Sequence, residues 1–527
     1  MGNIPAPSPL APIPSPRQMA WQRREIIAFV HFTVNTFTDR EWGLGDEDPA
    51  IFNPTQLDAG QWARALKAGG AKMVILTAKH HDGFCLWPSA LTDHCVRSSP
   101  WREGKGDVVR ELSDACAAEG LDFGVYLSPW DRHEATYGSG QEYNDYYVAQ
   151  LTELLTQYGT ISEFWFDGAC GEGPNGKRQV YDFARYWGTV RDLAPSAVMF
   201  SDAGPDVRWV GNESGYSADE SWSTVDRCRW GVGANNEHQT RGHEGGADWL
   251  PPETDVSIRP GWFYHASEDD RVKSLDKLLD IYYHSVGLNS VLLLNVPPDR
   301  RGLLHENDVA RLAEFRAVID ATFATDLAKG KPASASAVRG GDPLYGAANV
   351  TCDDQDTYWA TDDGVTSASV EVDLGGPTTF NVVALGEPIM LGQRVRRFHV
   401  EARIDGAWQP LAEGRTIGYL RLLRLAPVTA SAVRVTIDDA RACPCLNTVG
   451  LFLEPAKVEF NTDDRAFDAG AGMDLTLTAT VPGAQVRYTL DGSEPTGDSP
   501  LATGVLRLTD TTTVRARAWY EGLPSPY

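Results

Sequence analysis

Short apolar runs alternate with amphipathic helical segments through about the first 300 residues of the chain. Residues 73–78, 123–127 and 291–295 have the apolar composition of buried strands. Between such runs, segments like residues 143–158 carry apolar side chains at helical spacing and are followed by glycine. Parallel strands need crossover helices of this kind. The sustained alternation therefore predicts an α/β fold, a (β/α)8-like TIM barrel.

Further predicted strands fill out the barrel. They are residues 25–34, 163–166, 198–200, 207–210 and 261–264. Helical spacing of apolar residues recurs between several of them, including residues 181–193 and 272–286. The alternation of strands and helices therefore continues to about residue 300.

The periodicity changes near Lys329. The segment KGKPASASAVRGG is small, polar and proline-bearing, as a connection between domains is. Beyond it apolar and polar residues alternate, which predicts all-β structure, and a second break lies near Pro455. The predicted organisation is a Pro-rich N-terminal extension (1–22), the barrel (23–328) and two all-β sandwich domains (329–455 and 456–527).

The charge balance excludes several classes of partner. Lys and Arg number 47 against 72 Asp and Glu, which gives a formal charge of −25. Nucleic acids and anionic membranes would repel such a chain, so neither is predicted as a partner. No stretch approaches the about 18 consecutive apolar residues of a transmembrane helix. With 42% hydrophobic residues, the chain has ample material for a large core.

The cysteines and the N-terminus constrain the cellular compartment only weakly. Eight scattered cysteines are too few for a disulfide scaffold, and for the close pair Cys443 and Cys445 a short-loop disulfide and two thiols both stay open. The Pro-rich N-terminus lacks the apolar core of a signal peptide. Composition does not decide between an intracellular protein and one whose signal was removed earlier.

Polar residues follow the predicted strands at their C-terminal ends, where (β/α) barrels place reacting groups. In chain order they are His31, His80, His81, Asp82, Ser128, Asp131, Asp167, Asp202, Glu213 and Asn295. Polar residues at strand ends often only cap helices or turns. Capping accounts for one or two of them, but it does not require two adjacent histidines beside Trp and Tyr.

Two of these acids suit the cleavage of a glycosidic bond. Asp167 directly follows an apolar strand in the segment WFDG, although a lone Asp-Gly is usually only a turn. Glu213 lies 46 residues further on, about one and a half βα units downstream. In such a pair one carboxylate attacks the anomeric carbon and the other protonates the leaving oxygen and later activates water. Nearby Trp and Tyr residues offer stacking faces to a sugar ring.

The segment His80-His81-Asp82 is also a candidate metal cluster. Adjacent side chains at the end of a strand point to opposite sides, so they rarely bind one ion together. No other set of ligands at suitable spacing accompanies them. We favour hydrogen bonding to sugar hydroxyls for the two histidines and predict no catalytic metal.

Seven segments resemble glycoside hydrolase family 29, the α-L-fucosidases. They are HFTVNTFTDREWG, ILTAKHHDGFCLWPS, GVYLSPWDRHE, EFWFDGACGEGPNGK, SDAGPDVRWVGNESG, SIRPGWFYH and LLLNVPPDRRG, in unbroken order from about Trp21 to His305. The resemblance implies a retaining exo-α-L-fucosidase that needs no cofactor for catalysis. Its substrates would be fucosylated oligosaccharides or glycans.

The resemblance also implies roles for individual residues. Asp167 matches the nucleophile of the family. The fucose-contacting positions fall on His31, Glu41, Trp42, His80, His81, Tyr126 and Trp165. The acid/base is poorly preserved in the family, and the GNE placement of Glu213 resembles the branch that prefers α-1,3/1,4-linked fucose in Lewis-type glycans. That favours Glu213 over Glu172, Asp202 and Glu220. A broad-specificity or α-1,2-preferring fucosidase is the alternative.

The two C-terminal regions resemble accessory modules. Segments DDQDTYWAT and SAVRVTI resemble discoidin-like, family 32 carbohydrate-binding modules, and VRYTLDGSEPT resembles the chitobiase-type C-terminal β-sandwich. Asp353, Asp354 and Asp356 are candidates for a structural Ca²⁺ site, although an acidic surface turn is favoured. Appended sugar-binding modules suit an extracellular or periplasmic enzyme, with a cytoplasmic location left open. The sequence does not indicate an oligomeric state.

Overall fold

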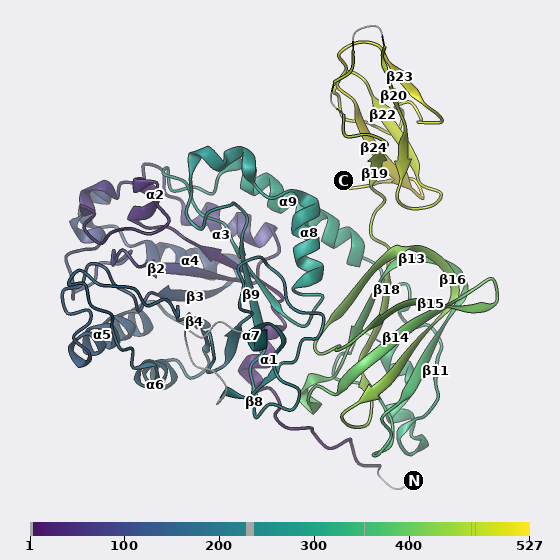
Figure 1. Cartoon of the computed structure of the whole chain (residues 1–527), viewed down its shortest axis with the longest axis horizontal. Helices are drawn as coiled ribbons and strands as arrows, with labels where there is room; N and C mark the ends of the chain where they lie inside the picture. Colours follow the sequence, from purple (N-terminus) through teal and green to yellow (C-terminus); the bar gives the residue numbers. More distant parts are fainter. Residues whose placement is uncertain (1–3, 228–236, 353, 465, 469–470) are drawn as a thin grey trace.

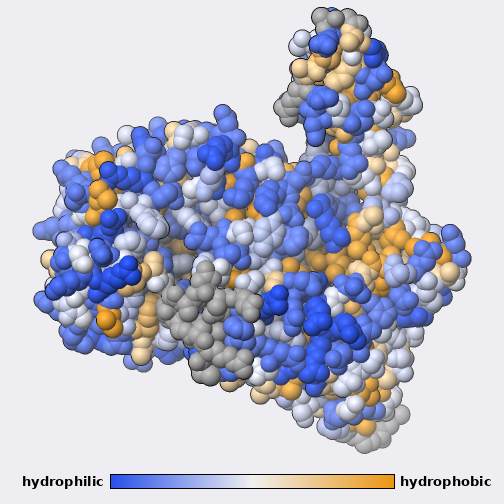
Figure 2. All heavy atoms as spheres, in the orientation of Figure 1, coloured by the Kyte–Doolittle hydropathy of each residue, from blue (hydrophilic) through white to orange (hydrophobic). Residues whose placement is uncertain are grey.

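The computed structural model describes residues 4–227, 237–352, 354–464, 466–468 and 471–527. A closed barrel, a long-stranded β domain beside it and a small β domain beyond that one make up the molecule (Figure 1). Hydrophilic residues cover much of the face shown in Figure 2. Among the described residues we find no helix long and apolar enough to span a membrane.

The barrel has eight parallel strands. They are β1 (Ile26–Val30), β2 (Met73–Lys79), β3 (Asp122–Leu127), β4 (Glu163–Trp165), β5 (Val198–Ser201), β6 (Val207–Trp209), β9 (Pro252–Ser257) and β10 (Val291–Asn295). They close in the order β1-β10-β9-β6-β5-β4-β3-β2. This confirms the predicted TIM-like barrel.

Helices cover the outside of the barrel (Figure 1). They are α3 (Ala59–Ala68), α4 (Val108–Glu119), α5 (Gln141–Gln157), α6 (Phe183–Leu193), α8 (Leu275–His284) and α9 (Glu306–Phe323), with the short α1 (Pro16–Gln22), α2 (Val34–Thr38) and α7 (Glu237–Arg241). Asp58, Asp107 and Asp182 cap α3, α4 and α6 by accepting a backbone N–H three residues on. Residues 202–206 join β5 to β6 without a helix.

The strand predicted at residues 261–264 is wrong. The strand is β9, and residues 261–264 belong to the loop that follows it. β9 is buried along its whole length, yet it carries the acids Glu253 and Asp255. Buried strands of parallel sheets are normally near-continuous apolar runs, so these acids removed the signal that sequence reading depends on.

The second domain is built on two very long strands. Its main sheet contains β11 (Ala333–Ala335), β13 (Ala368–Gly386), β14 (Val395–Ile404), β15 (Ala407–Gly414), β16 (Arg421–Ala440) and β18 (Thr448–Phe452). A two-stranded pair, β12 (Trp359–Ala360) and β17 (Cys445–Leu446), lies beside it. Trp359, Phe380 and Phe398 are fully buried in its core.

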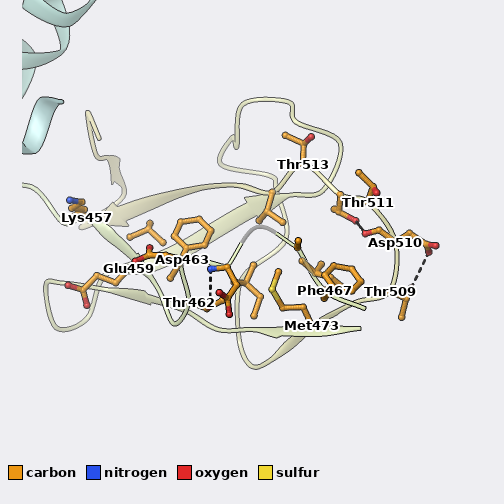
Figure 3. A pocket seen from close by; sticks show the side chains of 18 residues that line it. Lys457, Glu459, Thr462, Asp463, Phe467, Met473, Thr509, Asp510, Thr511 and Thr513 are labelled. Carbon is orange, nitrogen blue, oxygen red and sulfur yellow. Dashed lines mark hydrogen bonds between the residues drawn. The ribbon is translucent and has the colours of Figure 1, made fainter. Parts of the chain in front are cut away.

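The small third domain is entirely β. Its strands are β19 (Val458–Phe460), β20 (Met473–Leu475), β21 (Leu477–Ala479), β22 (Gln485–Thr489), β23 (Leu506–Leu508), β24 (Arg515–Tyr520) and β25 (Leu523–Pro524). A hollow of about 1250 Å³ opens in it, lined by Phe467, Met473 and Asp510 among others (Figure 3). None of the residues predicted for the active site lines this hollow.

The second domain braces a loop of the barrel. Gln393 accepts a hydrogen bond from the backbone N–H of Ser223 and donates one to the carbonyl of Ser221, both over 2.8 Å. Arg421 pairs with Asp219 in the same loop. Neither the β5–β6 connection nor the described part of this braced segment contains a helix longer than α7. The barrel strand β6 is joined to β9 through this segment, with β7 (Thr224–Val225) and β8 (Asp248–Trp249).

The Pro-rich N-terminal segment lies along the second domain before it enters the barrel. Arg339 donates to the carbonyl of Pro5 and Arg394 to that of Ser8, each over 2.7 Å. The backbone N–H of Leu10 donates to the carbonyl of Leu391 over 2.8 Å. The arginine side chains thus satisfy carbonyl oxygens that the N–H groups of a neighbouring strand would otherwise satisfy, and the prolines of the segment have no N–H that needs an acceptor. We call residues 4–10 the N-terminal strap.

The acidic turn of the second domain has defined partners, and the state of its close cysteine pair is defined as well. Asp353 lies outside the described residues, while Asp354 accepts the backbone N–H of Asp356 over 2.9 Å and Asp356 pairs with Arg23 at 3.4 Å. Cys443 and Cys445 are thiols in the structure. Asp354 and Asp356 therefore form an acidic surface turn.

Removing residues after Pro455 is expected to leave the predicted fucosidase activity largely unchanged. Lys457 pairs with Asp276 on α8 and Tyr527 donates to Glu454, but these contacts lie outside the barrel mouth. We expect kcat/KM to stay within about twofold and the solubility to fall, because apolar surface becomes exposed. A well-folded truncated protein without activity would show that the third domain reaches the active site.

Candidate active site

Aromatic and imidazole rings from four neighbouring strands meet at the C-terminal mouth of the barrel. His31 follows β1, His80 follows β2, and Tyr126 and Trp165 stand at the ends of β3 and β4. The ring centroids are 5.6 Å apart for His31 and His80, 5.6 Å for His80 and Tyr126, and 5.3 Å for Tyr126 and Trp165. The structure thus brings these predicted residues into one cluster.

Asp167 directly follows β4, and both of its oxygens are held. The hydroxyl of Tyr126 donates to Oδ2 over 2.9 Å, and the backbone N–H of Ala169 donates to Oδ1 over 2.7 Å. Gly168 allows a close approach, because a Cβ there would lie 2.1 Å from Asp202 Oδ2. The Asp167 side chain is 24% exposed. It is therefore fixed in direction yet open to a ligand.

The protonation of two histidines follows from their partners. His81 Nδ1 lies 2.7 Å from the hydroxyl oxygen of Ser128, which itself donates to the carbonyl of Trp130. His31 Nδ1 lies 2.8 Å from Asn295 Oδ1. Both Nδ1 atoms therefore carry the proton, and each Nε2 is left as an acceptor. His81 Nε2 lies 3.8 Å from Asp167 Oδ2, so it faces the carboxylate of Asp167.

Burial keeps these imidazoles neutral. It lowers the pKa of His31 to about 3 and that of His81 to about 4, and it lowers the pKa of His80 well below the usual value. At neutral pH the three rings are thus uncharged. They are suited to exchange hydrogen bonds with hydroxyl groups and not to donate a proton as acids.

Trp42 and Trp130 form an aromatic wall outside this cluster. Trp42 is 60% exposed, and its ring stands edge-on to Trp130 at 5.8 Å and to His81 at 6.2 Å. Trp130 packs so closely over Gly171 that a Cβ there would lie 2.1 Å from its ring. An exposed aromatic ring beside such a cluster is typical of surfaces that stack on sugar rings.

Glu41 holds the loop after β9. Its Oε2 accepts the backbone N–H of Trp262 over 2.8 Å, and its Oε1 accepts that of Phe263 over 3.1 Å. His265 lies 2.7 Å from the same Oε1. The predicted sugar contact at Glu41 is thus also an anchor for this loop.

Glu213 lies on the rim, and Trp262 reaches it. The indole N–H of Trp262 donates to Glu213 Oε2 over 3.1 Å. Among the rival acids, Glu220 pairs with Arg415 of the second domain at 3.5 Å, while Glu172 is exposed as Glu213 is. Glu213 is therefore connected to the wall of the ring cluster.

A comparison with family models identifies the barrel. The model described as Alpha-L-fucosidase matches residues 16–320, more than half of the 527 residues. The chain belongs to the α-L-fucosidase family. The models described as F5/8 type C domain and Chitobiase/beta-hexosaminidase C-terminal domain match residues 332–448 and 468–526 of this fucosidase. The resemblances to family 29 and to both accessory modules are thus confirmed.

Relatives extend the similarity over most of the fucosidase. Putative alpha-L-fucosidase 1 of Oryza sativa subsp. japonica is 47% identical over 463 residues, which cover 87% of this chain and 89% of the relative. Alpha-L-fucosidase 1 of Arabidopsis thaliana is 46% identical over 455 residues, 85% of this chain and 89% of the relative. The crystal structure of SpGH29 has a TM-score of 0.81 at 42% identity and covers 85% of this chain and 100% of its own. The chain is therefore an α-L-fucosidase, a glycoside hydrolase.

The segment around the adjacent histidines of the fucosidase is internally bonded. Asp82 accepts the hydroxyl of Thr33 over 2.8 Å and the backbone N–H of Phe84 over 2.7 Å. Within the described part of the chain, no three His, Cys, Asp or Glu residues are grouped so that they could hold a metal ion. Asp82 therefore fixes the turn that presents His80 and His81.

Sequence reading missed several residues of the fucosidase site. Trp262 lies in the segment wrongly predicted as a strand, and Trp130 stands next to the strand-end residue Ser128 that had been singled out. Asp255 on β9 is buried and accepts the indole N–H of Trp209 over 2.8 Å. Burial, then the charges of Glu213 and Asp167, raise the pKa of Asp255 well above its usual range. The sequence of β9, PETDVS, gives no apolar pattern that would have indicated a buried acid at this position.

Two buried glutamates fix Trp165 from inside the barrel. The indole N–H of Trp165 donates to Glu253 Oε1, and that of Trp21 on α1 donates to Glu163 Oε2, each over 2.7 Å. The remaining oxygens of these fully buried glutamates, Glu163 Oε1 and Glu253 Oε2, face each other. Both carboxylate oxygens are acceptors, so a hydrogen bond between them forms only if one of them carries a proton. Burial raises the pKa of Glu163 to about 7, and burial with the charge of Glu163 raises the pKa of Glu253 well above its usual range.

This pair makes the stability of the fucosidase fall at alkaline pH. The folded pKa values lie above the ordinary 4.5, so the folded chain holds a proton that the unfolded chain loses. The stabilisation is complete below about pH 4.5 and is lost as the pH rises through about 7 and beyond. We expect the melting temperature to fall between about pH 5 and pH 9 more steeply in the wild type than in Glu253→Gln, which needs no shared proton. Glu314→Gln on the surface of α9 should keep the wild-type slope, and an unchanged slope in Glu253→Gln would contradict the shared proton.

His80 is expected to bind a hydroxyl of the sugar, as the family resemblance implies. The residue is 5% exposed in the ring cluster, while its Nδ1 is shielded from solvent and has no hydrogen-bond partner among the described residues. His80→Ala should therefore lower kcat/KM by about 10- to 100-fold, measured with an aryl fucoside. Unchanged kinetics with a lower melting temperature would show that His80 is only structural.

Proposed function

We propose that this fucosidase is a retaining exo-enzyme in which Asp167 is the nucleophile and Glu213 the acid/base. The supporting observation is their placement on one ring cluster. Tyr126 and Ala169 aim the carboxylate of Asp167 into the mouth, and Trp262, which packs 5.1 Å from His31, bonds Glu213. A nucleophile held by hydrogen bonds and an acid on the rim are the two parts that double displacement needs.

In the first step an electron pair of the Asp167 carboxylate attacks the anomeric carbon of a terminal fucose. The electrons of the glycosidic bond move to the leaving oxygen, which takes the proton of Glu213. The result is a fucosyl ester on Asp167 and a carboxylate at Glu213. The hydrogen bond from Tyr126 to Asp167 disperses the charge before attack and orients the attacking oxygen.

In the second step the Glu213 carboxylate removes a proton from water. The water oxygen attacks the anomeric carbon from the face that the leaving group vacated, and the ester bond returns its electrons to Asp167. Two inversions give net retention, and both carboxyls return to their starting states. Neutral His31, His80 and His81 hold the hydroxyls of the sugar throughout.

We propose that the preferred substrates carry terminal α-1,3/1,4-linked fucose in Lewis-type glycans. The GNE segment around Glu213 supports this, as does the exposed ring of Trp42, which is backed by the buried Trp130 and offers a branched glycan a surface beyond the fucose. A Ruminococcus gnavus GH29 fucosidase in complex with fucose (37% identity, TM-score 0.80, covering 86% of this chain and 97% of its own) supports fucose as the sugar bound in the cluster.

The test compares two substrates and follows the first product formed. We expect kcat/KM for a Lewis-type trisaccharide to exceed that for an α-1,2-linked fucosyl disaccharide by at least about 100-fold, with α-L-fucose released first in a proton NMR time course. Equal rates on both linkages would support the alternative, a broad-specificity or α-1,2-preferring fucosidase. Initial release of the β-anomer would contradict the retaining mechanism.

The accessory domains suggest where the enzyme works. Matches to an F5/8 type C domain and a chitobiase-type domain support a role on polymeric or surface-bound glycans outside the cell or in the periplasm. Glycan binding to a variant that lacks the nucleophile measures what the second domain contributes. The comparison is between that variant with the second domain intact and the same variant with surface residues of the second domain replaced.

A further inference from the structure

Trp262 is the only described side chain seen to hydrogen-bond the carboxyl of Glu213, and it stands on a loop without regular structure. The loop is tied down at its backbone instead. Asn295 donates to the carbonyl of Trp262 over 2.8 Å, and Glu41 accepts the N–H groups of Trp262 and Phe263. The position of the indole N–H therefore depends on these anchors.

Glu41 is itself held by a histidine between two acids. His265 Nε2 lies 2.7 Å from Glu41 Oε1, and His265 Nδ1 lies 2.9 Å from Asp39 Oδ1. Both ring nitrogens thus face carboxylate oxygens, which accept and cannot donate. Only the imidazolium, with a proton on each nitrogen, bonds both acids at once.

The surroundings favour this charged form. Burial alone would lower the pKa of His265, but the hydrogen bonds to Asp39 and Glu41 outweigh it and raise the pKa above its usual value. Two further charged groups stand nearby: Arg300 lies 3.7 Å from Asp39, and Glu268 accepts the backbone N–H of Gly261 over 3.1 Å. The bridge therefore joins the segment after β1 to the loop after β9 by a charge-assisted contact.

The packing leaves this contact little freedom. A Cβ at Gly261 would lie 2.6 Å from Glu41 Oε1 and 3.0 Å from His265. The His265 side chain is only 14% exposed. A loss of the bridge would therefore move the loop itself.

We propose that His265, by bridging Asp39 and Glu41, is a positioning residue that sets the direction of the Glu213 carboxyl through Trp262. The proposal rests on the proposed role of Glu213 as acid/base. Because the indole N–H occupies Oε2, that oxygen is the acceptor and the proton for the leaving group sits on Oε1. The bridge thus selects which oxygen of Glu213 delivers the proton.

A positioning role of this kind has a kinetic signature that depends on the leaving group. A fucose linked to N-acetylglucosamine leaves poorly and needs the proton, whereas nitrophenolate leaves without it. His265→Gln should lower kcat/KM for the Lewis-type trisaccharide by about tenfold or more and that for nitrophenyl fucoside by less than about twofold. His399→Gln is the matched control, because His399 also stands between two acids, Asp438 at 2.9 Å and Glu401 at 3.8 Å, in the second domain.

A double-mutant cycle tests whether His265 acts through Trp262. Trp262→Phe keeps an aromatic ring but removes the N–H, so it should raise the ratio of aryl to trisaccharide activity as His265→Gln does. Adding His265→Gln to Trp262→Phe should then change that ratio by less than about twofold. Independent, multiplying effects, or equal losses on both substrates, would overturn the proposal.

Two further variants keep the outcomes distinct. If His265→Gln fails to fold, Asp39→Asn carries the test: Asp39 has φ 62°, a conformation that Asn tolerates, and the change removes one charge of the bridge. It should lower the trisaccharide rate alone, and an unchanged ratio would again overturn the proposal. If the activity of Glu213→Ala does not depend on the leaving group, the proposed function fails. If the activity of Glu213→Ala depends on the leaving group but that of His265→Gln does not, only the positioning role fails.

Discussion

Replacing Asp167 by glycine is expected to lower kcat/KM for every fucoside by several orders of magnitude, because covalent attack has no substitute. The fold should persist, since the side chain is partly exposed and its partners are Tyr126 and one backbone N–H. Asp167→Asn should lose as much activity while keeping the shape of the side chain. Steady-state kinetics and a melting curve together separate loss of chemistry from loss of structure.

Azide makes this prediction specific. In the space left by Asp167→Gly, azide can attack the anomeric carbon and restore turnover, giving a fucosyl azide of inverted configuration. Asp202→Asn is the matched control, because its carboxylate lies directly behind Gly168. That variant should lose far less activity and gain nothing from azide. A near-normal rate in Asp167→Gly would show that the nucleophile is another residue.

Replacing Glu213 by alanine is expected to separate the two steps of the reaction. Hydrolysis of a fucose linked to N-acetylglucosamine should fall by several orders of magnitude, because its leaving oxygen needs a proton. The first step with a nitrophenyl fucoside should keep a rate much closer to that of the wild type. Loss of the base for the second step then makes hydrolysis of the ester limiting, so a burst of nitrophenol should appear.

Azide should accelerate this variant with retention of configuration, because it attacks the fucosyl ester on Asp167 without needing a base. A retaining pair also places the two carboxyls about 5–5.5 Å apart, which a structure of a substrate complex measures. Equal slowing of both substrates and no effect of azide would reduce Glu213 to a structural residue. Asp202 and Glu172 would then be the next residues to replace.

The barrel could be predicted because most of its strands are apolar runs. Residues 73–78, 123–127 and 291–295 coincide closely with β2, β3 and β10. β9 could not be predicted, because the interior of this barrel accommodates acidic side chains that accept hydrogen bonds from indoles and share a proton. A local pattern records only that a residue is acidic. Whether a tryptophan from another strand satisfies it depends on the closed barrel.

The candidate site divides in the same way. His31, His80, Tyr126 and Asp167 lie on or next to strand ends, so their convergence followed from the barrel alone. The anchoring of Trp262 by Glu41 joins loops more than 200 positions apart. Loop conformations follow from many weak contacts, and no spacing in the sequence encodes them.

The N-terminal strap has a consequence for how the chain is made. Arg339 and Arg394, which bind Pro5 and Ser8, follow them by 334 and 386 positions. At a synthesis rate of about 5–20 residues per second, the strap leaves the ribosome well over ten seconds before its binding surface exists. The barrel can assemble in that interval, with Trp21 already inside it. The strap can therefore reach its bound position only after the second domain, which is synthesised after the barrel, has folded and presents Arg339 and Arg394.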